Sequence, residues 1–140
     1  MTYSRVETLG SIMGLKLRGG EEIIGRIRKG LPAGVCTRVI KAYKVSQDDF
    51  AHKIHVNKKT IQRQAAKGVF AVEISDRLLR LADVFARASE VFEDKDEARV
   101  WMHEESKALG GVSPWSLLDT SAGIDLVIKE LGRIEHGVVS

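Results

Sequence analysis

The sequence predicts an all-α fold, an N-terminal bundle of short helices followed by a small helical C-terminal domain, on three observations. Apolar residues recur every three to four positions along most of the 140-residue chain, which is the period of an amphipathic helix. Ser, Asn and Asp residues that can cap helices precede several of these segments, and glycines follow them. Residues 1–70 contain 14 Lys and Arg against 5 Asp and Glu, whereas residues 71–140 contain 8 against 14. The resulting charges of +9 and −6 favour different partners for the two halves, and chance segregation of charge on a solvated surface is the alternative.

The first half is predicted to contain a flexible lead-in and four short helices. Residues 1–20 are rich in glycine and show no sustained period, so we expect them to be flexible. The domain at residues 21–70 begins with "GGEEIIGRIRKG", in which glutamates occupy the first turn of a helix and cations occupy the last. The segment "AGVCTRVIKAYK" carries apolar residues at helical spacing. Ser46 is placed to cap a third helix in "SQDDFAHKIH", and Asn57 is placed to cap a fourth that ends at Gly68.

The last two of these helices fit the helix-turn-helix pattern, in which the second helix lies in the major groove of DNA. A turn of three to four residues joins them, and the stretch "HVNKKTIQRQ" supplies long side chains able to reach phosphates and base edges. His55 stands in the turn where a residue with positive φ is common, and histidine tolerates that conformation better than most residues do. A solvated basic helix in a bundle is the alternative. The residues expected to contact DNA are Lys58, Lys59, Thr60, Gln62, Arg63 and Lys67.

The segment 71–93 is predicted to form one long helix that connects the two parts. Its apolar stripe comprises Ile74, Leu78, Leu81, Ala82, Phe85 and Phe92. Asp83 precedes Arg87 by four residues, in the order that favours an ion pair along a helix. Leu79 and Val84 widen the stripe beyond what one packing contact needs, so we consider them candidates for the interface of a homodimer. Burial against the protein's own helices is the alternative.

Residues 94–140 are predicted to form a capped helix, a short helical turn and a final helix. Asp94 opens the first helix, and the Gly110–Gly111 pair stops the chain after it. Pro114 begins the helical turn, and Gly137 ends the final helix. The residues expected to point inward are Val100, Trp101 and Leu109 in the first helix and Ile124, Val127, Ile128, Leu131 and Ile134 in the last.

No arrangement of residues predicts an enzyme or a metal site. The stretch "HEESK" begins like the zinc motif H-E-x-x-H, but Lys107 occupies the position of the second histidine. His52 and His55 have no third ligand near them in the sequence, and Cys36 lies on an apolar helical face, where cysteine acts as a small hydrophobe. We therefore expect no catalytic residues, no metal and no cofactor. A lone cysteine fits a reducing cytoplasm, and no apolar run reaches the roughly 18–20 residues of a membrane helix.

Several stretches of the second half resemble one protein family. In chain order they are "SDRLLRLADVF", "ARVWM", "ALGGVSPWSLLDTSAG" and "LGRIEHGV". Together they resemble the Xre/MbcA/ParS antitoxin family, and the likeness extends over residues 21–140. The resemblance implies a helix-turn-helix domain joined to a C-terminal toxin-binding domain, here residues 94–140. It also implies a cytoplasmic RES-domain toxin that consumes or uses NAD, an active site that the antitoxin blocks, and repression of the antitoxin's own operon by an oligomer.

The resemblance places the contact with the toxin near the end of the chain, where we expect polar residues to be exposed. A guanidinium there can pair with a catalytic carboxylate, and a glutamate can meet the cations that hold phosphate. The residues expected to contact the toxin are Arg133, Glu135, His136, Gly137 and Val138. Two alternatives stay open at this point. One is a stand-alone helix-turn-helix repressor whose C-terminal half only dimerises or binds a small effector, and the other is a helical adaptor that binds no DNA.

Overall fold

The computed structural model describes residues 2–137, and every regular element in that range is helical. The helices are α1 (Tyr3–Met13), α2 (Gly20–Lys29), α3 (Gly34–Tyr43), α4 (Gln47–Lys53), α5 (Lys58–Ala66), α6 (Val72–Phe92), α7 (Lys95–His103) and α8 (Ser121–Glu135), with the short 3-10 helices η1 (Lys107–Leu109) and η2 (Trp115–Leu117) between α7 and α8. The predicted all-α fold class is confirmed. Helices α2 to α6 and α8 occupy the segments that the sequence predicts for them.

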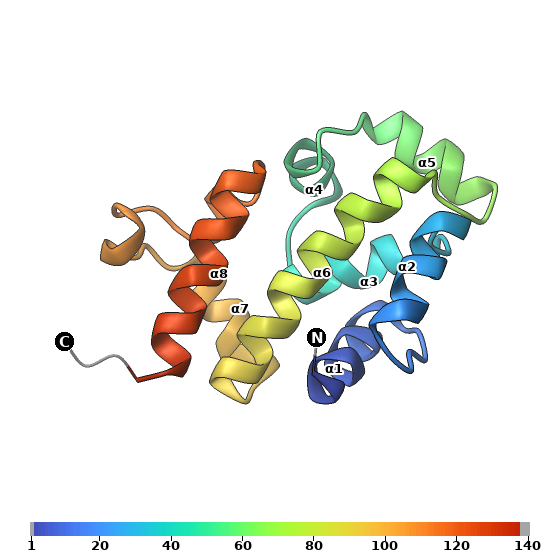
Figure 1. Cartoon of the computed structure of the whole chain (residues 1–140). Coiled ribbons are helices and arrows are strands. Elements are labelled where there is room, and N and C mark those ends of the chain that lie inside the picture. The colour runs from blue at the N-terminus through green and yellow to red at the C-terminus, as the bar shows by residue number, and fades with distance from the viewer. Residues whose placement is uncertain (1, 138–140) are drawn as a thin grey trace.

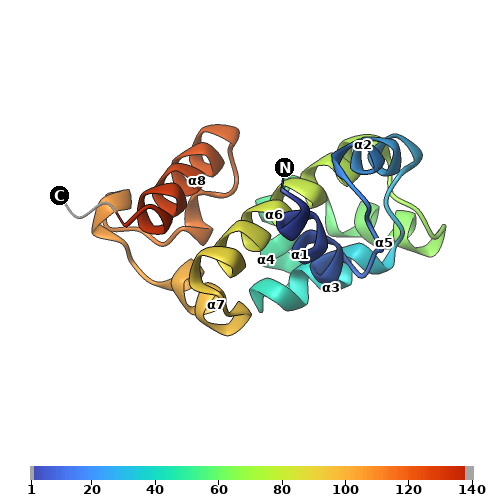
Figure 2. The same cartoon turned by 60° about the horizontal axis from the view of Figure 1, so that its bottom comes forward.

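Helix α6 is the centre of the fold. Figure 1 shows it running through the middle of the molecule, with α1, α2 and α3 on one side and α8 on the other, and Figure 2 shows the same arrangement from a second direction. Its buried residues are Ile74, Ser75, Leu78, Leu81, Ala82, Val84, Phe85, Ala86, Ala88 and Ser89. Tyr43 of α3 packs edge-on against Phe85, with ring centroids 5.0 Å apart. The core therefore combines side chains from both halves of the chain.

The expectation of a flexible lead-in at residues 1–20 is wrong, because α1 is a packed helix. Thr2 caps it by accepting a hydrogen bond from the backbone N–H of Arg5 at 3.2 Å. Its inward side chains, which pack in the core, are Val6, Leu9, Ile12 and Met13. Gly14 forms the C-cap of this helix with φ 73°, a conformation that glycine adopts without strain, so this glycine ends a helix and does not mark a flexible segment.

The expected dimer interface on α6 is wrong at Val84, which is fully buried inside the chain. Leu79 is partly buried and packs against the core. The reason is that helices of the same chain cover the wide apolar stripe of α6 from more than one side. On its polar face the predicted pair is confirmed, with Arg87 Nε 3.1 Å from Asp83 Oδ2.

The inward face of α7 also differs from the expected one. Ala98 and Met102 are fully buried, whereas Val100, which the sequence pattern places inward, is 57% exposed. Ala98 and Met102 lie one turn apart on α7, and burial of both fixes which face of the helix turns inward. The helix is also shorter than expected, because Glu104 adopts an extended conformation. Ile134 of α8, expected inward, is 38% exposed.

Replacing Leu9 by alanine tests whether α1 belongs to the core. Leu9 is fully buried, so the cavity left by Leu9→Ala should lower the free energy of unfolding by about 2–5 kcal/mol. Glu7 lies on the exposed side of the same helix, and Glu7→Ala should change this free energy by less than about 0.5 kcal/mol. Urea titration followed by circular dichroism measures both. Equal stability of Leu9→Ala and the parent protein would show that α1 is not part of the core.

Candidate functional site

The predicted helix-turn-helix is formed by α4, α5 and the turn between them. Ser46 Oγ accepts a hydrogen bond from the N–H of Asp49 at 3.0 Å, and Asn57 Oδ1 accepts one from the N–H of Lys59 at 2.8 Å. Both expected caps are thus confirmed, and each fixes the start of its helix. His55 adopts φ 58°, the left-handed conformation expected of it in the turn.

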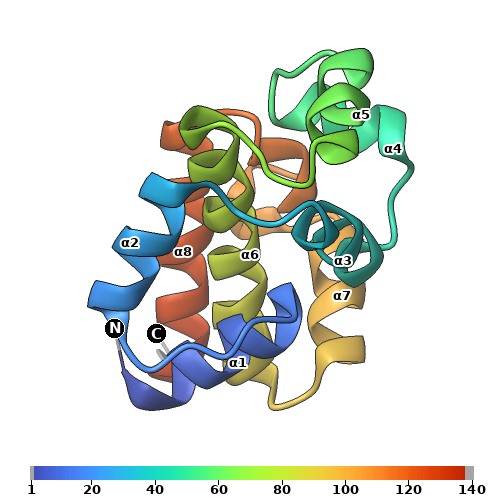
Figure 3. The same cartoon turned by 90° about the vertical axis from the view of Figure 1, so that its right-hand side faces the viewer.

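The outward face of α5 is open to solvent. Thr60 is half-buried, and the other residues expected to contact DNA are exposed: Lys58, Lys59, Gln62, Arg63 and Lys67. Lys58 Nζ lies 3.1 Å from Asp48 Oδ1, so this ammonium is already paired with a carboxylate of α4. Lys59 and Arg63 stand one turn apart, and within residues 2–137 neither takes part in an ion pair. Lys67, directly after α5, is also outside the ion pairs of these residues, so the described face offers three free cations, and Figure 3 shows α5 at the edge of the molecule.

A tryptophan from the second half of the chain packs against α3 and α4. Trp115 is buried, and its indole Nε1 donates a hydrogen bond to Asp49 Oδ2 at 3.1 Å. Its ring centroid lies 4.8 Å from that of Tyr43 and 6.5 Å from that of Phe50. Lys53 Nζ lies 5.0 Å from the same ring, within the range of a cation–π contact. Trp115 therefore fixes the position of α4, and with it the helix-turn-helix, relative to the C-terminal domain.

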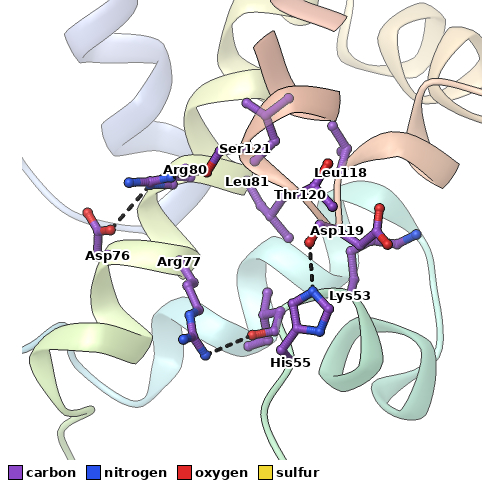
Figure 4. A pocket seen from close by; sticks show the side chains of 12 residues that line it. Lys53, His55, Asp76, Arg77, Arg80, Leu81, Leu118, Asp119, Thr120 and Ser121 are labelled. Atoms are coloured by element: carbon purple, nitrogen blue, oxygen red, sulfur yellow. Dashed lines mark hydrogen bonds and ion pairs between the residues drawn. The ribbon is translucent and has the colours of Figure 1, made fainter. Parts of the chain in front are cut away.

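A pocket of about 320 Å³ lies where the turn before α5 meets the first half of α6 and the start of α8 (Figure 4). His55 Nε2 is 2.6 Å from the carbonyl oxygen of Asp119, and since a carbonyl can only accept, this nitrogen donates the proton. Arg77 donates to the carbonyl oxygen of Ile54 at 3.1 Å, and Arg80 reaches the start of α8. These bonds join three elements, so we interpret the polar groups of the pocket as structural links.

Helix α7 caps the end of α3. Arg99 Nε donates to the carbonyl oxygen of Ala42 at 2.7 Å, and His103 Nε2 lies 2.7 Å from the carbonyl oxygen of Tyr43. The last carbonyls of a helix have no partner within it, and donors from another helix satisfy them. Helices of the segment expected to bind DNA and of the segment expected to bind a toxin therefore contact each other directly.

The residues expected to contact a toxin gather at the last turn of α8. The four that the structure describes are exposed: Arg133, Glu135, His136 and Gly137. Arg133 Nε lies 3.1 Å from Oε2 of Glu130, a carboxylate on a residue that is only 9% exposed, so this pair anchors the guanidinium to the helix. Gly137 adopts φ 57° directly after His136, the C-cap of α8. Val138 lies outside the described residues.

A metal cluster and the lone cysteine are the remaining candidates for reactive chemistry in the described residues. Between residues 2 and 137, no group of three or more His, Cys, Asp or Glu side chains is arranged to hold a metal ion. Burial raises the pKa of the Cys36 thiol to about 11, so the group is protonated near neutral pH and is a poor nucleophile. In the same part of the chain, no helix combines the length and the apolar character required to cross a lipid bilayer.

The fold and the exposed α5 define a two-domain helix-turn-helix protein. Its residues 22–83 match the antitoxin Xre-like helix-turn-helix domain, and residues 87–137 match the antitoxin Xre/MbcA/ParS C-terminal toxin-binding domain. The chain belongs to the Xre/MbcA/ParS antitoxin family, as the motifs of its sequence predict. The family's toxin-binding domain thus comprises the end of α6, α7, η1, η2 and α8.

Individual relatives agree with this membership. Antitoxin Xre of Photorhabdus laumondii is 31% identical over 130 residues, which are 91% of this chain and 88% of that protein. A protein of Sphingobium sp. named Prs ADP-ribosylating antitoxin is 31% identical over 124 residues, 81% of this chain and 78% of that protein. The crystal structure of the M. tuberculosis MbcT–MbcA toxin–antitoxin complex contains a chain of similar fold, with a TM-score of 0.56 and 21% identity over 77% of this chain and 96% of that one.

The links between the two domains are the part of the site that the sequence pattern does not reveal. Trp115 and Asp119 stand in a stretch without helical period, and their partners Asp49 and His55 are 66 and 64 residues away along the chain. The one local indication of this contact is the type of residue 115 itself, because a tryptophan is mostly buried in folded proteins.

A double-mutant cycle on Trp115 and Asp49 tests the link. Trp115→Phe keeps an aromatic ring in the core but removes the indole donor, and Asp49→Asn weakens the acceptor. Because the two groups are hydrogen-bonded, the destabilisations measured by urea unfolding should be non-additive by about 0.5–1.5 kcal/mol. The same cycle with Trp101→Phe and Asp49→Asn serves as the control and should be additive within about 0.3–0.5 kcal/mol. Additivity in the first cycle would show that the bond does not join the domains.

Proposed function

We propose that this chain is the antitoxin of a two-gene toxin–antitoxin module, which neutralises a RES-domain toxin by blocking its active site and represses its own operon by binding DNA. One observation carries the proposal: a single chain joins the toxin-binding domain of this family to a helix-turn-helix whose outward face is free. The structural relative supports it, because its crystal structure is that of a toxin–antitoxin complex.

Two observations support a toxin that acts on NAD. A relative is named Prs ADP-ribosylating antitoxin, and ADP-ribosyl transfer uses NAD as its donor. A site that binds a pyrophosphate is cationic, and the half of this chain that docks there carries 14 acidic residues against 8 basic ones. In this proposal Glu135 meets the cations that hold phosphate, and Arg133 pairs with a carboxylate of the toxin's active site.

The helix-turn-helix supports operator binding through α5. Arg63 is long enough to reach base edges in the major groove, while Lys59 and Thr60 are nearer the start of the helix and contact phosphates. Proteins with this motif bind two half-sites as dimers, so the form that represses is a homodimer. Because Val84 is buried within one chain, the dimer interface uses other residues.

Substitutions on α5 separate base reading from phosphate contact. Arg63→Ala should weaken operator binding by about 1–3 kcal/mol and relax the preference at one base pair, because a bidentate contact is lost. Lys59→Ala should weaken all sequences alike and lower the salt slope by about 1. Lys58→Ala is the matched control: its ammonium is paired with Asp48, so its effect should be smaller than that of Lys59→Ala.

Fluorescence anisotropy with the duplex upstream of the gene, at two salt concentrations, measures these effects. The antitoxin is titrated alone and together with its toxin. If neither form binds that duplex at low salt, α5 does not read DNA and the repressor part of the proposal is wrong.

Deleting residues 134–140 tests the blocking of the active site. The cut retains Arg133 beside the Glu130 carboxylate, so α8 should stay packed. Co-expression of the shortened chain with the neighbouring toxin should no longer rescue growth or cellular NAD, while operator binding stays unchanged. Lys129→Ala, at an exposed position earlier on α8, should rescue fully. Rescue by the shortened chain would show that another part of the domain neutralises the toxin.

A further inference from the structure

A second surface of the C-terminal domain has the form of a docking groove. It lies where α6 ends and α7 begins. These segments are yellow in Figure 1, at the lower end of the molecule, and Figure 2 shows them with that end turned forward. The groove has a volume of about 330 Å³ and is lined by Phe92, Asp96, Glu97, Val100, Trp101 and Glu104. None of these residues belongs to the set expected to contact the toxin at the end of α8.

The floor of the groove is apolar. Val100 is 57% exposed, which is the largest exposure among the exposed large hydrophobic residues of the described chain. Beside it, the half-buried rings of Phe92 and Trp101 lie with centroids 5.6 Å apart. An aliphatic residue beside two partly exposed aromatic rings forms a contiguous apolar patch, and such patches with polar rims mark interaction sites.

The rim of the groove is acidic. Asp96 is neutralised by Arg99, whose Nη1 lies 2.8 Å from its Oδ1. Glu97 and Glu104 are exposed, and within residues 2–137 neither forms an ion pair. Glu97 lies in the first turn of α7, where a carboxylate stabilises the helix dipole, but Glu104 directly follows the last turn, where it does not. The carboxylate of Glu97 therefore stabilises α7, whereas the carboxylate of Glu104 makes no contribution to the stability of this helix.

The charge of the rim decides between the possible occupants. A second copy of the chain related by a two-fold axis would bring the same carboxylates face to face, which is unfavourable. A cationic partner with an apolar side chain fits both the rim and the floor. The lining residues lie within residues 87–137, which match the toxin-binding domain of the family. We infer that the groove binds the toxin, by receiving an apolar side chain that Lys or Arg residues flank; this inference rests on the proposed function.

The groove and the end of α8 can serve one partner because they lie at the same end of the molecule. Helix α8 packs against α6, and α7 follows directly after the C-terminal end of α6. Figures 1 and 3 show α7 and the C-terminal end of α8 in the same lower part of the molecule. In this arrangement the groove anchors the toxin while the end of α8 blocks its active site.

Val100→Lys is the most direct test. The position is exposed on the outer face of α7, so a lysine there stays solvated and the fold is retained. Its charge should repel the cationic partner and raise the Kd for the neighbouring toxin, used in a catalytically inactive form, by at least about tenfold. Ile24→Lys, at a residue of α2 that is 52% exposed, is the matched control and should bind the toxin as the parent protein does.

Removing the rim charge provides a second, independent variant. Glu97→Gln combined with Glu104→Gln should slow association with the toxin about tenfold at low salt and flatten its dependence on salt, because electrostatic steering is lost. Surface plasmon resonance measures both rates. Light scattering and thermal melting of each variant check its oligomeric state and its fold.

The outcomes separate the inference from the proposed function. If the parent chain does not bind the toxin, the proposed function fails. If the parent chain binds and both groove variants bind equally well, the function stands and the inference is wrong. A change of oligomeric state in Val100→Lys with unchanged toxin affinity would assign the groove to a second copy of the chain, and this also overturns the inference.

Discussion

Helix α6 has to be covered on more than one side, and the rest of the structure follows from this constraint. Its buried residues include Val84, Phe85 and Ala86, which are consecutive and therefore point in directions about 100° apart around the helix. A single neighbouring helix could not bury them all. The helices α1 and α3 cover one part of the surface and α7 and α8 another, so both domains are completed by the same core helix. The domain boundary that the family matches place between residues 83 and 87 therefore falls inside one continuous, buried helix.

This shared core fixes where the two binding surfaces lie. Trp115 of the C-terminal domain donates a hydrogen bond to Asp49 of α4. His55, in the turn between α4 and α5, donates one to the carbonyl oxygen of Asp119, just before α8. Figure 1 shows α5 at the upper end of the molecule and the end of α8 at the lower end. A toxin bound at the lower end would leave the outward face of α5 uncovered. The geometry is thus compatible with an antitoxin that holds its toxin and its operator at the same time.

What the sequence predicts correctly is set by local chemistry. The caps Ser46 and Asn57 and the left-handed His55 depend on a few neighbouring residues, so the helix-turn-helix could be predicted to within a residue or two. The errors concern properties that depend on distant partners. Val84 is indistinguishable in the sequence from an interface residue until the helices that bury it are placed. Val100 is apolar yet exposed, because the burial of Ala98 and Met102 decides which face of α7 turns inward. The hydrogen bond from Trp115 to Asp49 joins residues that are 66 positions apart in the sequence.

A core helix shared by both domains implies that the helix-turn-helix and the toxin-binding domain form one rigid body around α6. Residual dipolar couplings of backbone amides in a weakly aligned sample test it most directly, because they report the orientation of each helix in a common frame. If the two domains are one rigid body, couplings from α3 to α5 and from α7 and α8 should fit a single alignment tensor with the helix directions of Figure 1. Two tensors of clearly different magnitude, one for each domain, would contradict it, since they would show that the domains reorient independently.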